Sequence, residues 1–133
     1  MDTLPFKVLV CGGREYTNKE KVFSVLTALG GVPMGDVDNP SWLPRPDLVI
    51  MHGGARGADT LADGWAVTNW VPVEEYRADW DKYGKGAGFI RNKQMLEQGK
   101  PDLVIAFPGG RGTNNMIELA REANIAVEVI VDG

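Results

Sequence analysis

The chain has 133 residues, 44% of them hydrophobic, and a formal net charge of -4 at pH 7. This length suits one packed core and is short for two ordinary domains, so we expect a single domain over residues 1–133. The acidic balance, with a pI near 4.9, argues against broad affinity for nucleic acid, which needs Lys and Arg to neutralise phosphates. A small anionic ligand remains compatible with it, because local backbone N–H groups and a few arginines are enough to bind one.

Membrane and metal partners are not expected either. No apolar stretch approaches the roughly 20 residues that span a bilayer, and no charged region followed by an apolar signal segment begins the chain. A cytoplasmic protein is therefore predicted. Cys11, the single cysteine, lies in an apolar run and is predicted to be a core residue. With one histidine and no clustered cysteines, we expect no metal site and no resident cofactor.

In chain order, three short apolar runs predict buried strands over 7–11, 47–51 and 102–107, each followed by Gly or Pro-Gly. Apolar runs without polar alternation are typical of parallel strands covered on both faces. Two further strands are predicted over 71–76 and 126–131.

Helices are predicted between these strands, over 18–29, 58–70, 87–97 and 113–123, from apolar residues at helical spacing. Strands that alternate with helices of this length indicate repeated βαβ units. The predicted fold class is α/β: a Rossmann-like, doubly wound open sheet of about five parallel strands with helices on both faces.

The connection over about 30–46 is rich in proline and glycine and is predicted to be an irregular loop or insertion. Long loops are often functional or mobile. A solvated excursion, a cover over the site and a subunit contact all remain open for it.

Three glycine-rich turns, over 12–14, 53–57 and 109–113, each follow a predicted strand and precede a helix. In open α/β sheets ligands bind outside the carboxyl ends of the strands, where helix N-termini attract anions. Glycine there permits positive φ and lets phosphate oxygens reach the backbone. Neither a P-loop nor a Gly-x-Gly-x-x-Gly motif is present, so a Walker-type NTPase or an ordinary dinucleotide oxidoreductase is not expected.

The segment Pro108-Gly109-Gly110-Arg111-Gly112-Thr113 looks like the Pro-Gly-Gly-x-Gly-Thr signature of LOG-type nucleotide-binding families. Almost the whole chain outside the 30–46 connection resembles the YspA-type, YpsA-related branch of the SLOG superfamily. The resemblance rests on that segment together with Cys11-Gly12-Gly13-Arg14-Glu15-Tyr16, His52-Gly53-Gly54-Ala55-Arg56-Gly57-Ala58-Asp59, Ala78-Asp79-Trp80 and Ala87-Gly88-Phe89-Ile90-Arg91-Asn92-Lys93. It implies a Rossmann-like fold and a nucleotide or nucleotide-derived ligand.

Arginines fall in or beside the strand-to-helix connections, and the planar, always charged guanidinium suits phosphate. The residues predicted to bind the ligand are Gly12, Gly13, Arg14, Gly53, Gly54, Ala55, Arg56, Gly57, Asp59, Trp80, Arg91, Asn92, Pro108, Gly109, Gly110, Arg111, Gly112 and Thr113.

Arg91, His52 and Asp59 are the candidate catalytic residues. His52 is expected to face the crevice, either for acid–base work or hydrogen-bonded to nearby backbone. Asp59 either caps the second helix or meets a ligand hydroxyl. In the next connection Trp80 either stacks on a base or packs in the core, and Asp79 is placed to meet a ribose.

Two functions follow from these residues. The leading hypothesis is binding or sensing of a phosphate-bearing nucleotide or derivative, AMP- or ADP-ribose-like. The alternative is a phosphoribohydrolase or N-glycosidase acting on nucleoside monophosphates or ADP-ribose derivatives. LOG enzymes place a catalytic Glu three residues after the motif threonine, where this chain has Met116, and Glu118 is rotated about 200° from that position. A DNA-processing role has little support without a basic stripe, and a homodimer or higher homo-oligomer remains open.

Overall fold

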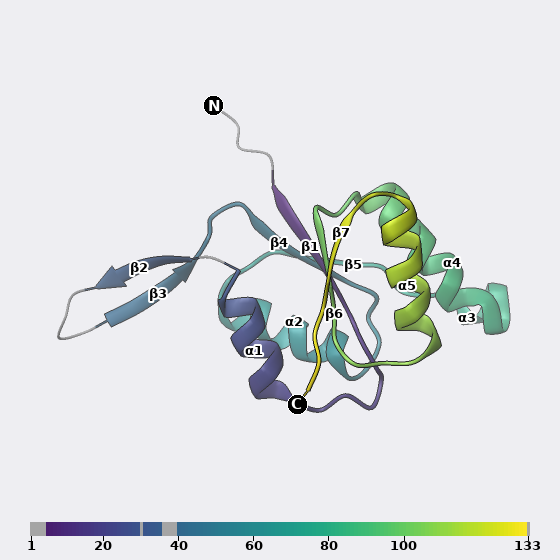
Figure 1. Cartoon of the computed structure of the whole chain (residues 1–133), viewed down its shortest axis with the longest axis horizontal. Helices are drawn as coiled ribbons and strands as arrows, with labels where there is room; N and C mark the ends of the chain where they lie inside the picture. The colour runs from purple at the N-terminus through teal and green to yellow at the C-terminus, as the bar shows by residue number, and fades with distance from the viewer. Residues whose placement is uncertain (1–4, 30, 36–39, 133) are drawn as a thin grey trace.

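The computed structural model describes residues 5–29, 31–35 and 40–132, with side chains outside 31–35 and 40–44. Its centre is a five-stranded sheet in the order β5-β4-β1-β6-β7, in which every neighbouring pair is parallel (Figure 1). The strands are β1 (Phe6–Cys11), β4 (Leu48–His52), β5 (Val73–Glu75), β6 (Leu103–Ala106) and β7 (Ala126–Val129). The predicted Rossmann-like α/β fold is confirmed.

Strand β1 occupies the middle of the sheet, pairing Val8 with Ile50 of β4 on one side and with Leu103 of β6 on the other. From β1 the chain builds outward through β4 to β5, then returns and builds outward the other way through β6 to β7. The direction of winding therefore reverses between β1 and β6. In sheets of this kind the crevice outside the carboxyl ends of those two strands is the expected ligand site.

Helices cover both faces of the sheet (Figure 1). Helices α1 (Lys19–Thr27) and α2 (Ala58–Thr68) pack together on one face, and α4 (Ala87–Gln94) and α5 (Arg111–Glu122) pack together on the other. A short helix α3 (Trp80–Tyr83) and a 3-10 turn η1 (Gly84–Gly86) precede α4, which continues as a π-helical turn η2 (Met95–Gly99). Over the described part of the chain, no helix has the length and apolar character that crossing a bilayer requires.

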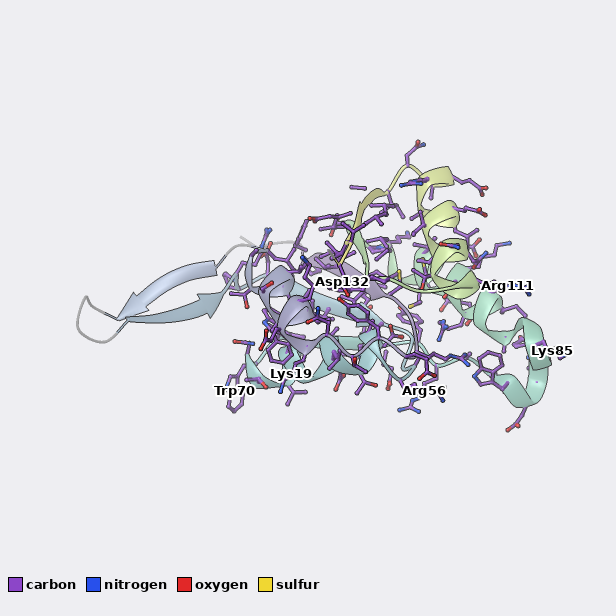
Figure 2. All side chains as sticks on the ribbon, turned by 60° about the horizontal axis from the view of Figure 1, so that its bottom comes forward. Lys19, Arg56, Trp70, Lys85, Arg111 and Asp132 are labelled. Atoms are coloured by element: carbon purple, nitrogen blue, oxygen red, sulfur yellow. The ribbon has the colours of Figure 1, made fainter. Side chains whose placement is uncertain are left out.

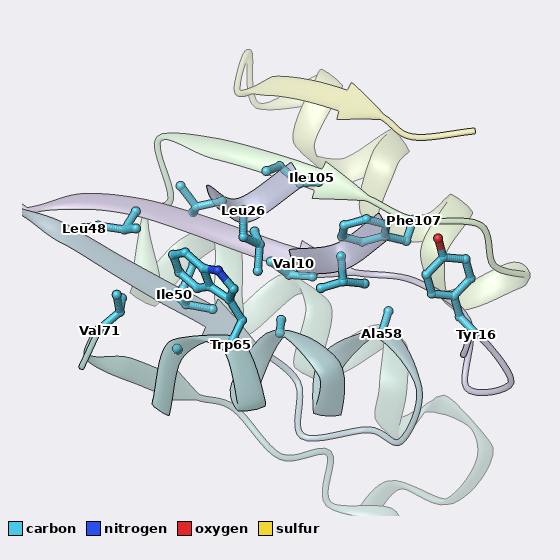
Figure 3. Packing of buried hydrophobic residues seen from close by; sticks show 14 residues of the cluster. Val10, Tyr16, Leu26, Leu48, Ile50, Ala58, Trp65, Val71, Ile105 and Phe107 are labelled. Atoms are coloured by element: carbon cyan, nitrogen blue, oxygen red, sulfur yellow. The ribbon is translucent and has the colours of Figure 1, made fainter. Parts of the chain in front are cut away.

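Two apolar cores lie on opposite faces of the sheet. On the α1–α2 face, one core includes Trp65, Val10, Ile50 and Phe107, all of them buried (Figure 3). On the α4–α5 face a smaller core holds Leu9, Met51, Met95, Leu96, Val104, Met116 and Ala120. Because successive residues of a strand point to opposite faces, β1 contributes Val8 and Val10 to the first core and Leu9 to the second.

The Pro/Gly-rich connection differs from its prediction. It contains two antiparallel strands, β2 (Gly31–Gly35) and β3 (Pro40–Pro44), with Val32 opposite Leu43. This β2–β3 hairpin projects away from the main sheet (Figure 1). The prediction of an irregular loop was therefore wrong over these strands, because a two-stranded ribbon has only edge strands, which tolerate proline. Residues 30 and 36–39 of the predicted loop lie outside the described residues.

Candidate functional site

The three glycine-rich turns interlock at the carboxyl ends of the strands. The Gly13 N–H donates to the Pro108 carbonyl at 2.8 Å, and the Ala58 N–H donates to the Gly13 carbonyl at 3.2 Å. A Cβ at Gly12 would lie 2.6 Å from the Ala58 Cβ, and Gly57, with φ +82°, lies directly against the Gly13 carbonyl. The close contact between the turns therefore requires glycine at positions 12 and 57. From the sequence alone, glycine in these turns was expected for a different reason, the close approach of a phosphate to the backbone.

Beside these turns lies the main cavity, of about 320 Å³, at the point where the winding of the sheet reverses. Its walls come from the β1 turn, the second turn, the α3–α4 region and the start of α5. The predicted ligand-binding residues among its lining are Gly12, Gly13, Arg14, Ala55, Asp59, Trp80, Arg91, Asn92, Gly110, Arg111, Gly112 and Thr113. The structure thus gathers residues from four distant segments of the chain.

The main cavity is cationic although the chain as a whole is acidic. Arg14, Lys85, Arg91 and Arg111 line it, against one carboxylate, Asp59. Figure 2 shows Lys85, Arg111 and Arg56 at the same end of the molecule, opposite the β2–β3 hairpin. Cationic walls with few acids attract a small anion even when the net charge of the protein is negative.

The N-terminus of α5 adds backbone N–H donors to the cationic side chains of the main cavity. Gly110 is its N-cap and no side chain caps it, so the N–H groups of the first turn are left for solvent or a ligand. A Cβ at Gly110 or Gly112 would meet no atom within 4 Å, so these two glycines border open space. Gly109 instead packs against Thr113 and Gly13.

Arg91 is held in a defined orientation by two hydrogen bonds. Its Nη1 donates to the Gly53 carbonyl at 2.7 Å, and its Nε donates to Asn92 Oδ1 at 3.0 Å. Burial lowers the pKa of this guanidinium and the nearby Asp59 opposes that shift, but an arginine stays charged under ordinary conditions. Within the described part of the chain its Nη2 makes no hydrogen bond, which leaves donors for an anion.

Asn92 lines the main cavity and also holds neighbouring groups in place. It is buried, and its amide donates to the Gly112 carbonyl at 3.1 Å and to Asn115 Oδ1 at 3.0 Å. Since both amide hydrogens are used and its oxygen accepts from Arg91, Asn92 positions the guanidinium and the start of α5. The motif over 87–93 pointed to Asn92 as a site residue, but no pattern in the sequence predicted that Asn115 would be its partner.

Asp59 braces the second glycine-rich turn. Its Oδ2 accepts the Gly53 N–H at 3.1 Å and the Ala55 N–H at 3.2 Å, while Gly57 is the N-cap of α2. Desolvation by burial raises the pKa of this carboxyl. Asp59 therefore stabilises the turn that precedes the helix, and it also lines the main cavity.

His52 does not face the main cavity, contrary to expectation. The ring is buried, its Nδ1 accepts the Gly54 N–H at 3.0 Å, and its Nε2 lies 2.8 Å from Asp63 Oδ1. An Nδ1 that accepts a hydrogen bond places the proton on Nε2, which then donates to Asp63. Of the two roles considered for His52, the structure shows the backbone-bonded one, because the end of β4 turns the ring towards α2.

Trp80 and Asp79 begin α3. Asp79 caps this helix, its Oδ1 accepting the Lys82 N–H at 3.1 Å, and it does not line the main cavity. Trp80 is 47% exposed and lines the main cavity, and the Arg14 guanidinium lies 5.1 Å from its ring centroid. This exposure rules out core packing for Trp80, and stacking on a base remains a prediction.

The structure also places several other residues that the sequence analysis considered or passed over. Met116 is fully buried in the core of the α4–α5 face and does not line the main cavity, and Glu118 is exposed. Arg56 forms an exposed ion pair with Glu15 at 2.6 Å. Lys85 and Phe89 line the main cavity but were not predicted to bind the ligand. Phe89 lies in the motif over 87–93, and Lys85 lies between Gly84 and Gly86. Within the described residues no group of three or more His, Cys, Asp or Glu could hold a metal ion.

Comparisons with known proteins agree with this architecture. The YspA, cpYpsA-related SLOG family matches residues 42–83. The Gene 61 protein of Mycobacterium phage D29 is 38% identical over 132 residues, which cover 91% of this chain and 93% of the relative. The chain belongs to the YspA, cpYpsA-related SLOG family.

A solved structure is similar in fold. DNA processing protein A (DprA) from Streptococcus pneumoniae superposes with a TM-score of 0.71 at 22% sequence identity. The match covers 98% of this chain and 51% of that one, so the chain spans about half the length of DprA. At this identity the likeness shows the shared fold alone.

Proposed function

We propose that the protein binds or senses a phosphate-bearing nucleotide or nucleotide derivative in the main cavity. The observation that carries the proposal is the convergence of four cationic side chains, an uncapped helix N-terminus and a half-exposed tryptophan on one cavity of about 320 Å³. Membership of a SLOG family supports a nucleotide-related ligand. The proposal includes a cytoplasmic location. It does not choose between a monomer, a homodimer and a higher homo-oligomer.

Each part of the ligand has a matching surface. The first turn of α5 with Arg111, and the free Nη2 of Arg91, supply donors for a phosphate. Trp80 and Phe89, each 47% exposed, offer aromatic surface for a base. A nucleotide carries both features, whereas inorganic phosphate would leave the aromatic wall unused.

Titration calorimetry with AMP and ADP-ribose is expected to show saturable binding, with inorganic phosphate weaker than either nucleotide. The base adds contact with the aromatic wall, and the phosphate adds charge-assisted hydrogen bonds. Folded protein free of copurified ligand that bound neither nucleotide at millimolar concentration would contradict the proposal.

The alternative function, N-glycosidic hydrolysis, has one observation in its favour. Asp59 is a carboxyl group at the wall of the main cavity with a raised pKa, as a general acid requires. Its Oδ2, however, already accepts two backbone N–H groups. The other position suggested for a carboxylate, 116, faces the core. Binding without rapid turnover is therefore the function that the geometry supports best.

Hydrolysis of AMP to adenine and ribose phosphate is accordingly expected to be absent or very slow. Chromatography of an overnight incubation measures it, with a heat-denatured sample as the control. Turnover of about 1 per second or more, in the ordinary enzymatic range, would overturn the binding reading. Asp59→Asn would then be the first variant to test.

A further inference from the structure

Next to the main cavity lies a second hollow of about 320 Å³, bordered by four arginines. They are Arg14, Arg56, Arg77 and Arg91, with the Gly53–Ala55 turn forming the floor. Arg14, Ala55, Trp80 and Arg91 line both spaces. The two are therefore adjacent compartments of one site, separated by a cationic and aromatic boundary.

The floor of the second hollow offers no backbone donors. The Gly53 and Ala55 N–H groups are accepted by Asp59, and the Gly54 N–H is accepted by His52. Recognition of an anion there depends on the arginine side chains, in contrast to the α5 end of the main cavity. Arg56 and Arg77 are paired with Glu15 and Glu75.

These ion pairs do not block a ligand. The side chains of Arg56 and Glu15 are 71% and 86% exposed, and Arg77 is 75% exposed at 3.2 Å from Glu75. Exposed pairs of this kind contribute little to stability, so an anion can displace the glutamates. At the boundary, Arg14 and Arg91 line both spaces, so their two positive charges lie on the same wall. An anion bound at this boundary would lie within reach of both guanidinium groups.

We propose that the second hollow is a subsite for the far half of a two-part nucleotide whose halves are joined through a diphosphate. Its linking phosphate meets Arg14 and Arg91 at the boundary, and Arg77 contacts the group beyond it. Two compartments of equal volume with cations at their junction match a ligand of this class better than a mononucleotide. The inference rests on the proposed nucleotide binding and deepens it.

The test compares AMP with ADP-ribose by calorimetry on the full chain and on Arg77→Ala. The unmodified protein is expected to bind ADP-ribose about tenfold or more tightly than AMP, because charge-assisted hydrogen bonds are added. Arg77→Ala is expected to remove most of that advantage and to leave the affinity for AMP unchanged. Lys93→Ala is the matched control, since Lys93 is exposed on α4 and lines neither compartment.

The outcomes separate this inference from the proposed function. Equal affinity for AMP and ADP-ribose, or equal weakening of both by Arg77→Ala, would overturn the two-part subsite while leaving nucleotide binding in place. If neither nucleotide bound the unmodified protein, the proposed function itself would fail. Folding of each variant is checked by its melting temperature, and Arg77 is exposed enough that its truncation should not unfold the protein.

Discussion

Replacing Met116 with glutamate is expected to destabilise the protein by about 3–5 kcal/mol, because an unpaired carboxylate would enter an apolar core. Met116 is fully buried with Leu9, Met95 and Val104 around it. Urea denaturation of the variant and the parent measures the loss. This cost should be smaller at pH 5 than at pH 8: burial raises the pKa of the folded-state carboxyl above its unfolded value near 4.3, so the penalty grows as pH rises from the unfolded pKa to the folded one.

The control is Glu118→Met, the reverse exchange on the exposed side of α5. It should change the free energy of unfolding by less than about 0.5 kcal/mol. If Met116→Glu instead folded with the parent's stability and hydrolysed AMP, position 116 would have access to the ligand and the assignment of its side chain to the core would be wrong.

Replacing Arg111 with alanine is expected to weaken AMP binding about tenfold or more with little change in melting temperature. Arg111 is exposed at the first turn of α5, lines the main cavity, and forms no ion pair or side-chain hydrogen bond within the described residues. Its charge is therefore free for a phosphate, and one charge-assisted hydrogen bond contributes roughly 1.5–3 kcal/mol. Calorimetry and thermal melting measure the two quantities.

Arg121→Ala is the matched control, because Arg121 is exposed in the last turn of the same helix and lies outside the main cavity. An unchanged affinity in Arg111→Ala, or an equal loss in both variants, would contradict a local role at the helix start.

Arg91→Ala is a less clean test than Arg111→Ala. It also removes the hydrogen bonds to Gly53 and Asn92, so its stability should fall together with its affinity.

The Met116→Glu experiment also addresses the choice between binding and hydrolysis. Resemblance to LOG enzymes aligns Met116 with a catalytic carboxylate, but the side chain faces the core here. Restoring a glutamate at that one position would therefore not by itself supply an acid to the main cavity. Evolution of hydrolysis in this scaffold would need an acid from another wall, of which Asp59 is the one present.

The sequence by itself determined the main elements and their order. Apolar runs such as residues 102–107 and helical spacing such as that of 18–29 are local signals, because burial on one or both faces requires apolar residues at a definite period. The glycine-rich turns after β1, β4 and β6 likewise placed the site at the carboxyl ends of the sheet. Gly110, Arg111 and Gly112 could be predicted in this way from their motif alone.

Only the tertiary structure decided which way individual side chains face. His52 turns to Asp63 on α2, 11 residues further along the chain, and Asn92 bonds to Gly112 on α5, 20 residues away. No local pattern in the sequence predicts either contact. The proline content of 30–46 argued against strands there, because proline has no N–H to donate. The structure nevertheless pairs β2 with β3, and each strand has a partner on one side only. The second hollow exists because the Arg77 segment lies beside the Arg14 turn, and such proximity depends on the packing of the whole chain.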